Sequence, residues 1–182
     1  MKNVPMMLPL LALILALAGC GGGGGATSQD VNPPQSTGKS ATISFSVLST
    51  ARLTAPVQGV QLSAFLPEGV TVATTAGSST VSSTALITGV GITSSNRQIY
   101  GTYSAPIRKV KITVATTEET FRGGEFAKLS VNYPSTINLT ANDFASANEP
   151  TVPFFQAAGY VVGTGSVDLT GKLRASLGVL FN

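Results

Sequence analysis

The sequence predicts an all-β fold between residues 39 and 182, an antiparallel β-sandwich of the jelly-roll kind. Two observations carry this prediction. Apolar and polar residues alternate with a period of two in many short segments, and no segment of this part holds a helical period for long. Ser, Thr, Gly, Val and Ala dominate, while charged residues make up only 10% of the chain, so a polar sheet face would carry hydroxyls rather than charges.

The expected strands follow one another along this part of the chain. The clear ones span 41–50, 57–66, 97–103, 107–115 and 126–133, and shorter or weaker ones span 70–72 and 81–88. In 107–115 the alternation is strongest, with Val110, Ile112 and Val114 on one face and Lys109, Lys111 and Thr113 on the other. Eight to ten short strands in about 144 residues are typical of a sandwich.

The second half of the domain carries three further expectations. The alternation over 126–133 puts Phe126 on the polar face of its strand. Residues 137–144 are expected to form another strand, or a strand that ends in a turn. Residues 160–169 and 172–180 are expected to form a closing hairpin with the Thr-Gly pair between them at the bend.

Residues 1–19 have the three parts of a cleaved secretion signal. Lys2 gives a positive start, an apolar run follows over 6–18, and Gly19 is the last small residue before Cys20. The run is about 13 residues long, whereas a membrane-spanning helix needs about 20. We therefore expect the segment to be removed after export, with cleavage between Gly19 and Cys20.

Leu17-Ala18-Gly19-Cys20 resembles the lipobox of bacterial lipoproteins, in which a leucine and two small residues precede the cysteine that receives lipid. The resemblance implies that Cys20 carries a diacylglycerol and a third acyl chain, which together make a stable membrane anchor. Gly21 follows in place of the aspartate that would favour the inner membrane, so we expect the cell envelope, and the outer membrane where there are two. The alternative is an ordinary signal that leaves Cys20, the single cysteine of the chain, as a spare thiol.

Residues 20–38 are expected to be the lipidated cysteine and a flexible tether. The segment contains a run of five glycines, a Pro-Pro pair and several Ser and Thr residues, and it has too little apolar content to bury a core. A coil of about 18 residues has a root-mean-square span of roughly 23 Å, enough to hold a folded domain clear of lipid headgroups. The domain then begins at Lys39.

Composition argues against catalysis and against nucleic-acid binding. The chain has no histidine, the commonest general base and metal ligand, and its single cysteine is expected to be acylated. No cofactor is implied. The formal charge of +3 falls to +2 without Lys2, and only residues 108–111 approach a basic patch. Oxygen ligands for calcium are sparse; Asn142-Asp143 and Asn148-Glu149 are the weak candidates.

Two stretches resemble cohesin modules. Residues 57–65 read VQGVQLSAF, similar to the early cohesin strand that opens with glycine, an apolar residue and glutamine. Residues 110–115 read VKITVA, and 121–131 read FRGGEFAKLSV, similar to a cohesin strand, a loop, Gly-Gly-Glu and a strand of the Ala-x-Leu-x-Val type. Two departures are the Leu-Pro-Glu-Gly turn at 66–69, where cohesins usually have Tyr-Asp-Pro, and a final stretch of about 30 residues without a match.

The resemblance implies a nine-stranded jelly roll that binds a dockerin-like protein through one sheet face. The candidate partner-binding residues are Lys109 and Lys111, with Tyr100 and Arg97 near them. The plainer interpretation is a solvated face whose lysines guard against edge-to-edge aggregation.

Two other functions stay open on the sequence. A polysaccharide-binding module would stack sugars on exposed aromatics, but the chain has no tryptophan, and Tyr100 and Tyr103 should face opposite sides of a strand. Phe154-Phe155, expected in a Pro-flanked loop, would form an apolar lip or plug the end of the sandwich. A structural lipoprotein would instead build an assembly through an unpaired sheet edge.

Overall fold

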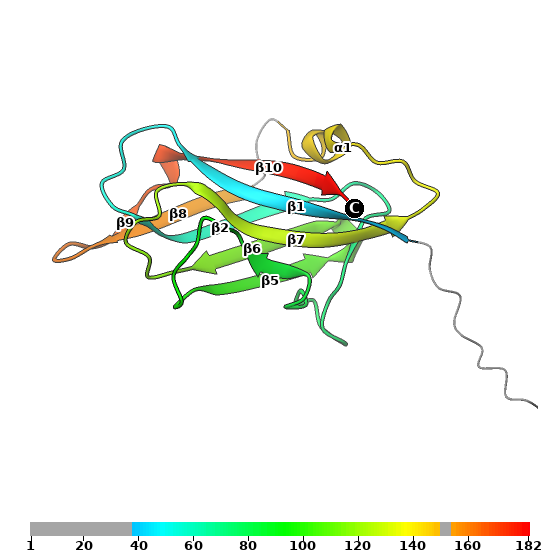
Figure 1. The fold of residues 1–182 in the computed structure, drawn as a ribbon, viewed down its shortest axis with the longest axis horizontal. Helices are drawn as coiled ribbons and strands as arrows, with labels where there is room; N and C mark the ends of the chain where they lie inside the picture. Colours follow the sequence, from blue (N-terminus) through cyan, green and yellow to red (C-terminus); the bar gives the residue numbers. More distant parts are fainter. Residues whose placement is uncertain (1–37, 150–153) are drawn as a thin grey trace, which may run out of the picture. The chain divides into compact units, whose positions relative to one another are not determined.

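A computed structural model describes residues 38–149 and 154–182, and they form an antiparallel β-sandwich of two sheets (Figure 1). The all-β prediction is therefore confirmed. The expected signal, the cysteine expected to carry lipid and almost all of the expected tether lie outside the described residues. Within the described part of the chain, no helix is both long enough and apolar enough to cross a membrane.

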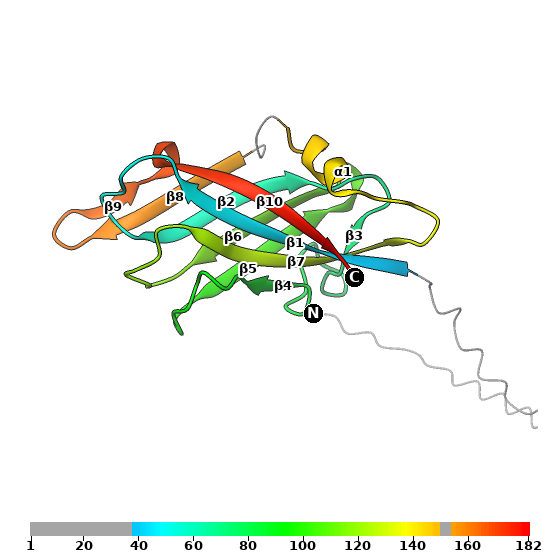
Figure 2. The ribbon, with the colours of Figure 1, turned by 45° about the horizontal axis from the view of Figure 1, so that its top comes forward.

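Sheet 1 has a central pair of long strands. Its members are β1 (Gly38–Ser49), β3 (Thr71–Val72), β4 (Leu86–Thr88), β7 (Gly124–Pro134) and β10 (Leu173–Phe181). The order is β10-β1-β7-β3, and β4 also pairs with β7 (Figure 2). Every pairing in this sheet is antiparallel.

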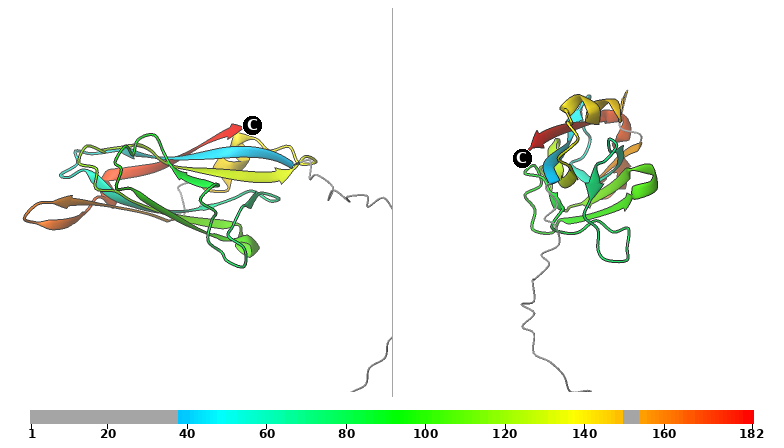
Figure 3. Two further views of the ribbon diagram at one scale, coloured as in Figure 1. Left: turned by 60° about the horizontal axis from the view of Figure 1, so that its bottom comes forward. Right: turned by 90° about the vertical axis from the view of Figure 1, so that its right-hand side faces the viewer.

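Sheet 2 also has five strands, again paired antiparallel, in the order β5-β6-β2-β8-β9. Its members are β2 (Val57–Phe65), β5 (Gln98–Ser104), β6 (Lys109–Ala115), β8 (Phe154–Val161) and β9 (Gly165–Asp168). Three short helical segments connect strands, namely η1 (Ala105–Ile107), α1 (Ala141–Ser146) and η2 (Thr170–Lys172). Figure 3 shows the two sheets facing each other.

The predicted alternation places the core between the two sheets. Ile43, Phe45 and Val47 of β1 are fully buried, as are Leu62 of β2 and Ile112 of β6. The alternating partners point outward and are polar on most strands, as is usual for antiparallel sheets with one wet face. The core therefore follows from the period-two pattern of the sequence.

Phe126 is the exception to this alternation. The sequence pattern put it on the polar face of β7, but its side chain is fully buried and lies 6.5 Å from the ring of Phe45. The register between β1 and β7 shifts here, because Phe45 pairs with Ala127 while Ser46 pairs with Glu125. Phe126 is thus the extra residue of a β-bulge, which turns two consecutive side chains inward.

Two other expectations were wrong. Residues 137–144 form no strand; they lead into α1, whose Phe144 plugs the core with no exposure. The closing hairpin is made by β8 and β9 instead, with Gly163 and Gly165 at positive φ in its turn. β10 then crosses to sheet 1 through η2 and pairs with β1, so the Thr-Gly bend changes sheets rather than closing a hairpin.

Asn148 fastens the segment after α1 to the end of β2. Its side-chain Oδ1 accepts a hydrogen bond from the N–H of Phe65 at 2.8 Å, and its Nδ2 donates to the carbonyl oxygens of Phe65 and Phe144, each at 2.9 Å. The residue is 8% exposed. The amide therefore continues the strand pairing of Phe65 just before β8 begins at Phe154.

Candidate recognition face

The outer face of sheet 2 consists of the side chains that point away from sheet 1. Strand register arranges them in rows that cross the sheet. One row runs Tyr100, Thr113, Gln61 and Gln156 over β5, β6, β2 and β8. Hydroxyls and amides therefore lie side by side across four strands, in the strand-to-strand spacing of about 4.8 Å.

The next row consists mainly of small residues. Ala115, Gly59 and Ala158 are neighbours in register, and Asp168 of β9 pairs with Ala158 at the far side. Because these three residues have little or no side chain, the sheet surface is lower here than at the neighbouring amide row. The row therefore forms the floor of a depression.

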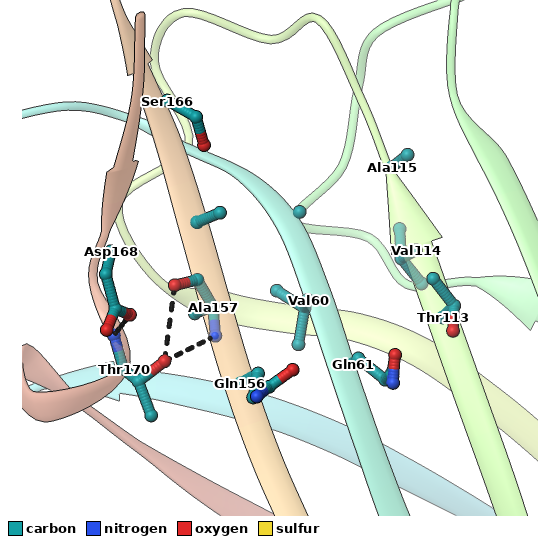
Figure 4. Close-up of a pocket in the computed structure, with 12 residues that line it drawn as sticks. Val60, Gln61, Thr113, Val114, Ala115, Gln156, Ala157, Ser166, Asp168 and Thr170 are labelled. Carbon is teal, nitrogen blue, oxygen red and sulfur yellow. Dashed lines mark hydrogen bonds between the residues drawn. The ribbon is translucent and has the colours of Figure 1, made fainter.

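This depression is a groove of about 560 Å³ (Figure 4). Thr113, Gln61 and Gln156 border it on one side, and Ser166, Asp168 and Thr170 border it on the side of β9 and η2. Its hydrogen-bonding groups are amides and hydroxyls with one carboxylate. Such a lining suits a neutral or partly cationic polar ligand better than an anionic one.

Asp168 is held at the edge of the groove by η2. The hydroxyl and the backbone N–H of Thr170 hold the pKa of Asp168 below its usual range, and the N–H lies 2.9 Å from Oδ1. Thr170 is itself fixed to β8, because its Oγ1 accepts a hydrogen bond from the N–H of Ala157 at 3.1 Å. The groove therefore presents one ionised carboxylate in a fixed position.

The opposite end of the outer face is basic. Lys111 is exposed and pairs in register with Thr102 on one side and Ser63 on the other. Lys109 is half-buried, and its Nζ lies 6.0 Å from the centre of the Phe65 ring, within range of a cation–π contact. Within the described ranges neither lysine forms an ion pair, since the single salt bridge there joins Lys128 to Glu125.

The structure brings together three of the four predicted partner-binding residues. Lys109 and Lys111 point outward as expected, and Tyr100, 55% exposed, lies diagonally across from Lys111 because it pairs with Thr113. Arg97 does not join them. It precedes β5 at the groove end of the sheet, and its Nη1 donates to the carbonyl of Ser94 at 3.1 Å.

Tyr100 and Tyr103 of β5 face opposite sides of the sheet, as the alternation predicts, whereas the expected loop at Phe154-Phe155 is part of β8. Tyr103 is 8% exposed, its hydroxyl donates to the carbonyl of Val70 at 3.1 Å, and burial raises the pKa of its phenol. Phe154 begins a strand rather than lying in a loop, so it is 37% exposed on the outer face. Tyr160, 51% exposed, lies beyond the groove on the same strand.

Sequence reasoning missed the groove residues Gln61, Gln156 and Asp168. The alternation of 57–66 gave the direction of Gln61, but nothing in the sequence indicated that β8 would lie beside β2. Their common row exists only through the pairing of strands that are about 95 residues apart in the chain.

The weak calcium candidates have other partners. The side-chain oxygen of Asn148 binds the N–H of Phe65, and an Asp143 oxygen accepts from both the N–H and the hydroxyl of Thr140 at the start of α1. In the part of the chain that the structure describes, no three His, Cys, Asp or Glu residues gather into a possible metal site.

The carboxylate of Glu118 accepts four hydrogen bonds and links two loops. Its two oxygens accept hydrogen bonds from the N–H and hydroxyl of Thr93, the N–H of Ser94 and the hydroxyl of Thr120, at 2.7 to 2.9 Å. The Thr93 hydroxyl contributes most to lowering the pKa of Glu118 to about 2. The carboxylate has no remaining short contact to offer a ligand, so its role here is to hold 93–94 against 118–120.

No protein-family model matches this chain, and neither a curated protein nor a solved structure is significantly similar to it.

Proposed function

We propose that this chain is a lipid-anchored binding module of the bacterial envelope that docks a protein partner through the outer face of sheet 2. The supporting observation is the face itself. It is an open, five-stranded surface of hydroxyls and amides, with Lys111 unpaired toward one end. An open polar sheet face of this kind is what the cohesin resemblance implies.

The charges on the face indicate the character of the partner. Lys109 and Lys111 lie at one end, and Asp168 lies at the other, across the groove. A complementary surface would place acidic side chains over the lysines and a donor over Asp168. Such pairs raise the rate of association and fix the orientation of the partner more than they add affinity.

The position of the groove fits display from a tether. The described chain begins at Gly38, the start of β1, and the β8–β9 hairpin lies at the opposite end of the sandwich (Figures 1 and 2). In an anchored protein the tether would join at the β1 end. The hairpin and the groove beside it would then be the part farthest from the point of attachment.

A pulldown from envelope and secreted fractions of the native organism tests this function, with the non-lipidated mature chain as bait. We expect one discrete partner. A dockerin-like calcium-loop repeat in that partner, with binding lost on chelation, would support the cohesin-like interpretation. Lys111→Glu should weaken its binding about tenfold, the effect of reversing one charge within an interface. Arg52→Glu is the matched control, because Arg52 is exposed in the loop between β1 and β2. Equal affinities for the two variants would refute docking through this face.

Carbohydrate binding is the second candidate, and the groove is the observation that favours it. Gln61, Gln156 and Asp168 offer the donors and acceptors that bind sugar hydroxyls, and exposed Tyr100 and Tyr160 lie on the two sides of the groove. The tyrosines are not in one row, so they do not form a continuous stacking platform.

A panel of soluble polysaccharides, measured by affinity electrophoresis, separates the two candidates. Glycan binding should be lost in Gln156→Ala and kept in Lys111→Glu, and protein docking should respond in the opposite order. Val162→Ala is the control, since Val162 is 89% exposed at the tip of the same hairpin and outside the groove lining. Absence of binding to any glycan would remove this candidate.

A further inference from the structure

β10 is a long edge strand at one side of sheet 1 (Figure 2). All nine of its residues pair with β1 in an unbroken register, from Leu173 opposite Ser49 to Phe181 opposite Ala41. Among the described residues no strand pairs with its other edge. The strand contains no proline and one charged residue, Arg174, so neither proline nor a row of charges keeps this edge from pairing.

The other sheet edges in the described ranges are short or covered. β3 and β4 have two and three residues, and β9 has four. The seven-residue edge strand β5 is covered by a neighbouring segment, since the N–H of Val81 bonds to the carbonyl of Gly101 and the N–H of Tyr103 bonds to that of Ser79. β10 is therefore the one long edge there whose outer backbone groups, from Ala175 to Phe181, bond to no described segment. The helix α1 packs beside its C-terminal end, where the ring centres of Phe144 and Phe181 lie 6.1 Å apart.

The register identifies which backbone groups of β10 face away from β1. The N–H of Asn182 donates to Ser40, and the N–H of Thr50 donates to Lys172, so even-numbered residues bond to β1. The N–H and C=O groups of Ala175, Leu177, Val179 and Phe181 point to the free edge, while the N–H of Leu173 donates to the carbonyl of Thr170. They form a ladder ready to accept one more strand.

We propose that β10 pairs antiparallel with β10 of a second copy of this chain, centred on Leu177. This inference is independent of the proposed function, which uses the other sheet. Centring on Leu177 is the register that keeps all nine residues paired, and it makes the contact two-fold symmetric, as in most homodimers. The two copies of sheet 1 then become one continuous sheet.

Side chains fit this register. Ser176 lies opposite Gly178 of the second copy, and Arg174 lies opposite Leu180, so no like charges oppose each other. Leu180 is 67% exposed, and Leu177 and Val179 point toward the core while remaining only half-buried. A second copy covers these apolar groups, whereas an extended peptide rich in charge would not.

Pairing two cysteine variants in cells that express the full chain tests the register. Ser176→Cys in one tagged copy and Gly178→Cys in another would face each other in a non-hydrogen-bonded pair, with Cα atoms about 4.5 Å apart, within disulfide range. We expect a mixed disulfide dimer on non-reducing gels only when both are present. Ser46→Cys with Gly178→Cys is the control, because Ser46 lies one strand further from the contact, about 10 Å away and out of range.

A pair of substitutions at one exposed position tests the interface without disturbing the fold. Leu180→Lys places a cation opposite Arg174 of the second copy, and Leu180→Glu places an anion there. We expect the first to reduce the crosslink several-fold and the second to preserve it. Equal yields for both, no mixed disulfide at all, or a crosslink from β10 to a different protein would each overturn the proposal.

Discussion

Among the buried polar residues that the structure describes, Asn148 makes the most side-chain hydrogen bonds, so Asn148→Ala should cost the most stability of these. Asn148 makes three hydrogen bonds, two to the backbone of Phe65 and one to the carbonyl of Phe144, and it is 8% exposed. Alanine removes all three and leaves the N–H and C=O of Phe65 without partners at the end of β2. No residue of β8 can take the place of the Asn148 amide as their partner, because β8 begins opposite Ser63.

The expected magnitude follows from these contacts. A net hydrogen bond contributes about 1 kcal/mol, so three predict a loss of about 3 kcal/mol, and burial of the orphaned groups keeps the loss from being smaller. For a domain of this size, 1 kcal/mol corresponds to a change in Tm of about 3 °C, which gives a decrease of roughly 10 °C. Asn142→Ala is the matched control, since its exposed amide makes one hydrogen bond, at 3.3 Å to Ser146. We expect it to change Tm by less than about 2 °C, as surface substitutions do.

Asn148→Asp tests the same contacts through the pH dependence of stability, which alanine cannot do. Aspartate keeps the acceptor for the N–H of Phe65 but turns an oxygen toward the carbonyls of Phe65 and Phe144, so the folded state should raise its pKa above the unfolded value of about 3.9. The deficit relative to wild type should be small below pH 3.9 and should grow as pH rises through the folded pKa. Thermal unfolding followed by circular dichroism from pH 3 to pH 8 measures this. A decrease under 3 °C for alanine, or a pH-independent deficit for aspartate, would refute the strand-extension role.

Three further predictions concern other parts of the chain. The pKa of Glu118 is lowered to about 2, chiefly by the Thr93 hydroxyl, so this carboxylate contributes stability above pH 4.5 that is lost as pH falls toward 2. Glu118→Gln should therefore flatten the acid side of the plot of Tm against pH. An unchanged plot would contradict the loop-joining role. Gly159→Ala would place a Cβ 2.5 Å from the Pro56 carbonyl oxygen and should destabilise the fold by about 1 to 3 kcal/mol, measured by urea titration. Gly171→Ala is the control, because its Cβ meets nothing within 4 Å and should be nearly neutral. Equal effects of the two variants would count against close packing at Gly159. Cys20→Ala should move the protein from the membrane fraction to the soluble fraction, and retention in the membrane would contradict lipidation.

The sequence predicted the elements whose structure depends on local alternation. β1, β2, β5 and β6 follow the period-two pattern, because one face of each is packed against the other sheet and the other face is wet. Phe126 was misplaced because a bulge adds one residue to β7, and a bulge depends on the register with β1 rather than on β7 alone. The pattern of β10 also predicts a strand correctly, but it does not indicate the partner, because β1 lies about 130 residues away in the chain.

The candidate site divides in the same way between local and non-local information. The outward direction of Lys109, Lys111 and Tyr100 was predictable, because each is set by alternation within its own strand. Arg97 was misplaced because it lies before its strand begins, where alternation no longer fixes a direction. The groove was invisible, since Gln61 and Gln156 become neighbours only when β8 is placed beside β2.

The two proposed contacts differ in what a substitution can change. The outer face of sheet 2 is a surface of side chains, so its specificity can be changed by substitution at Lys111 or Gln156 without touching the backbone. The β10 contact is a surface of N–H and C=O groups, which almost any side chain leaves in place. Outward residues such as Leu180 and Arg174, which oppose each other, adjust its strength. A sequence relative that kept Arg174 as the single charge of β10 while varying the rows of sheet 2 would therefore keep its dimer and change its partner. One that placed lysines along β10 would have given up the edge contact, because charge is the ordinary protection of an unpaired strand.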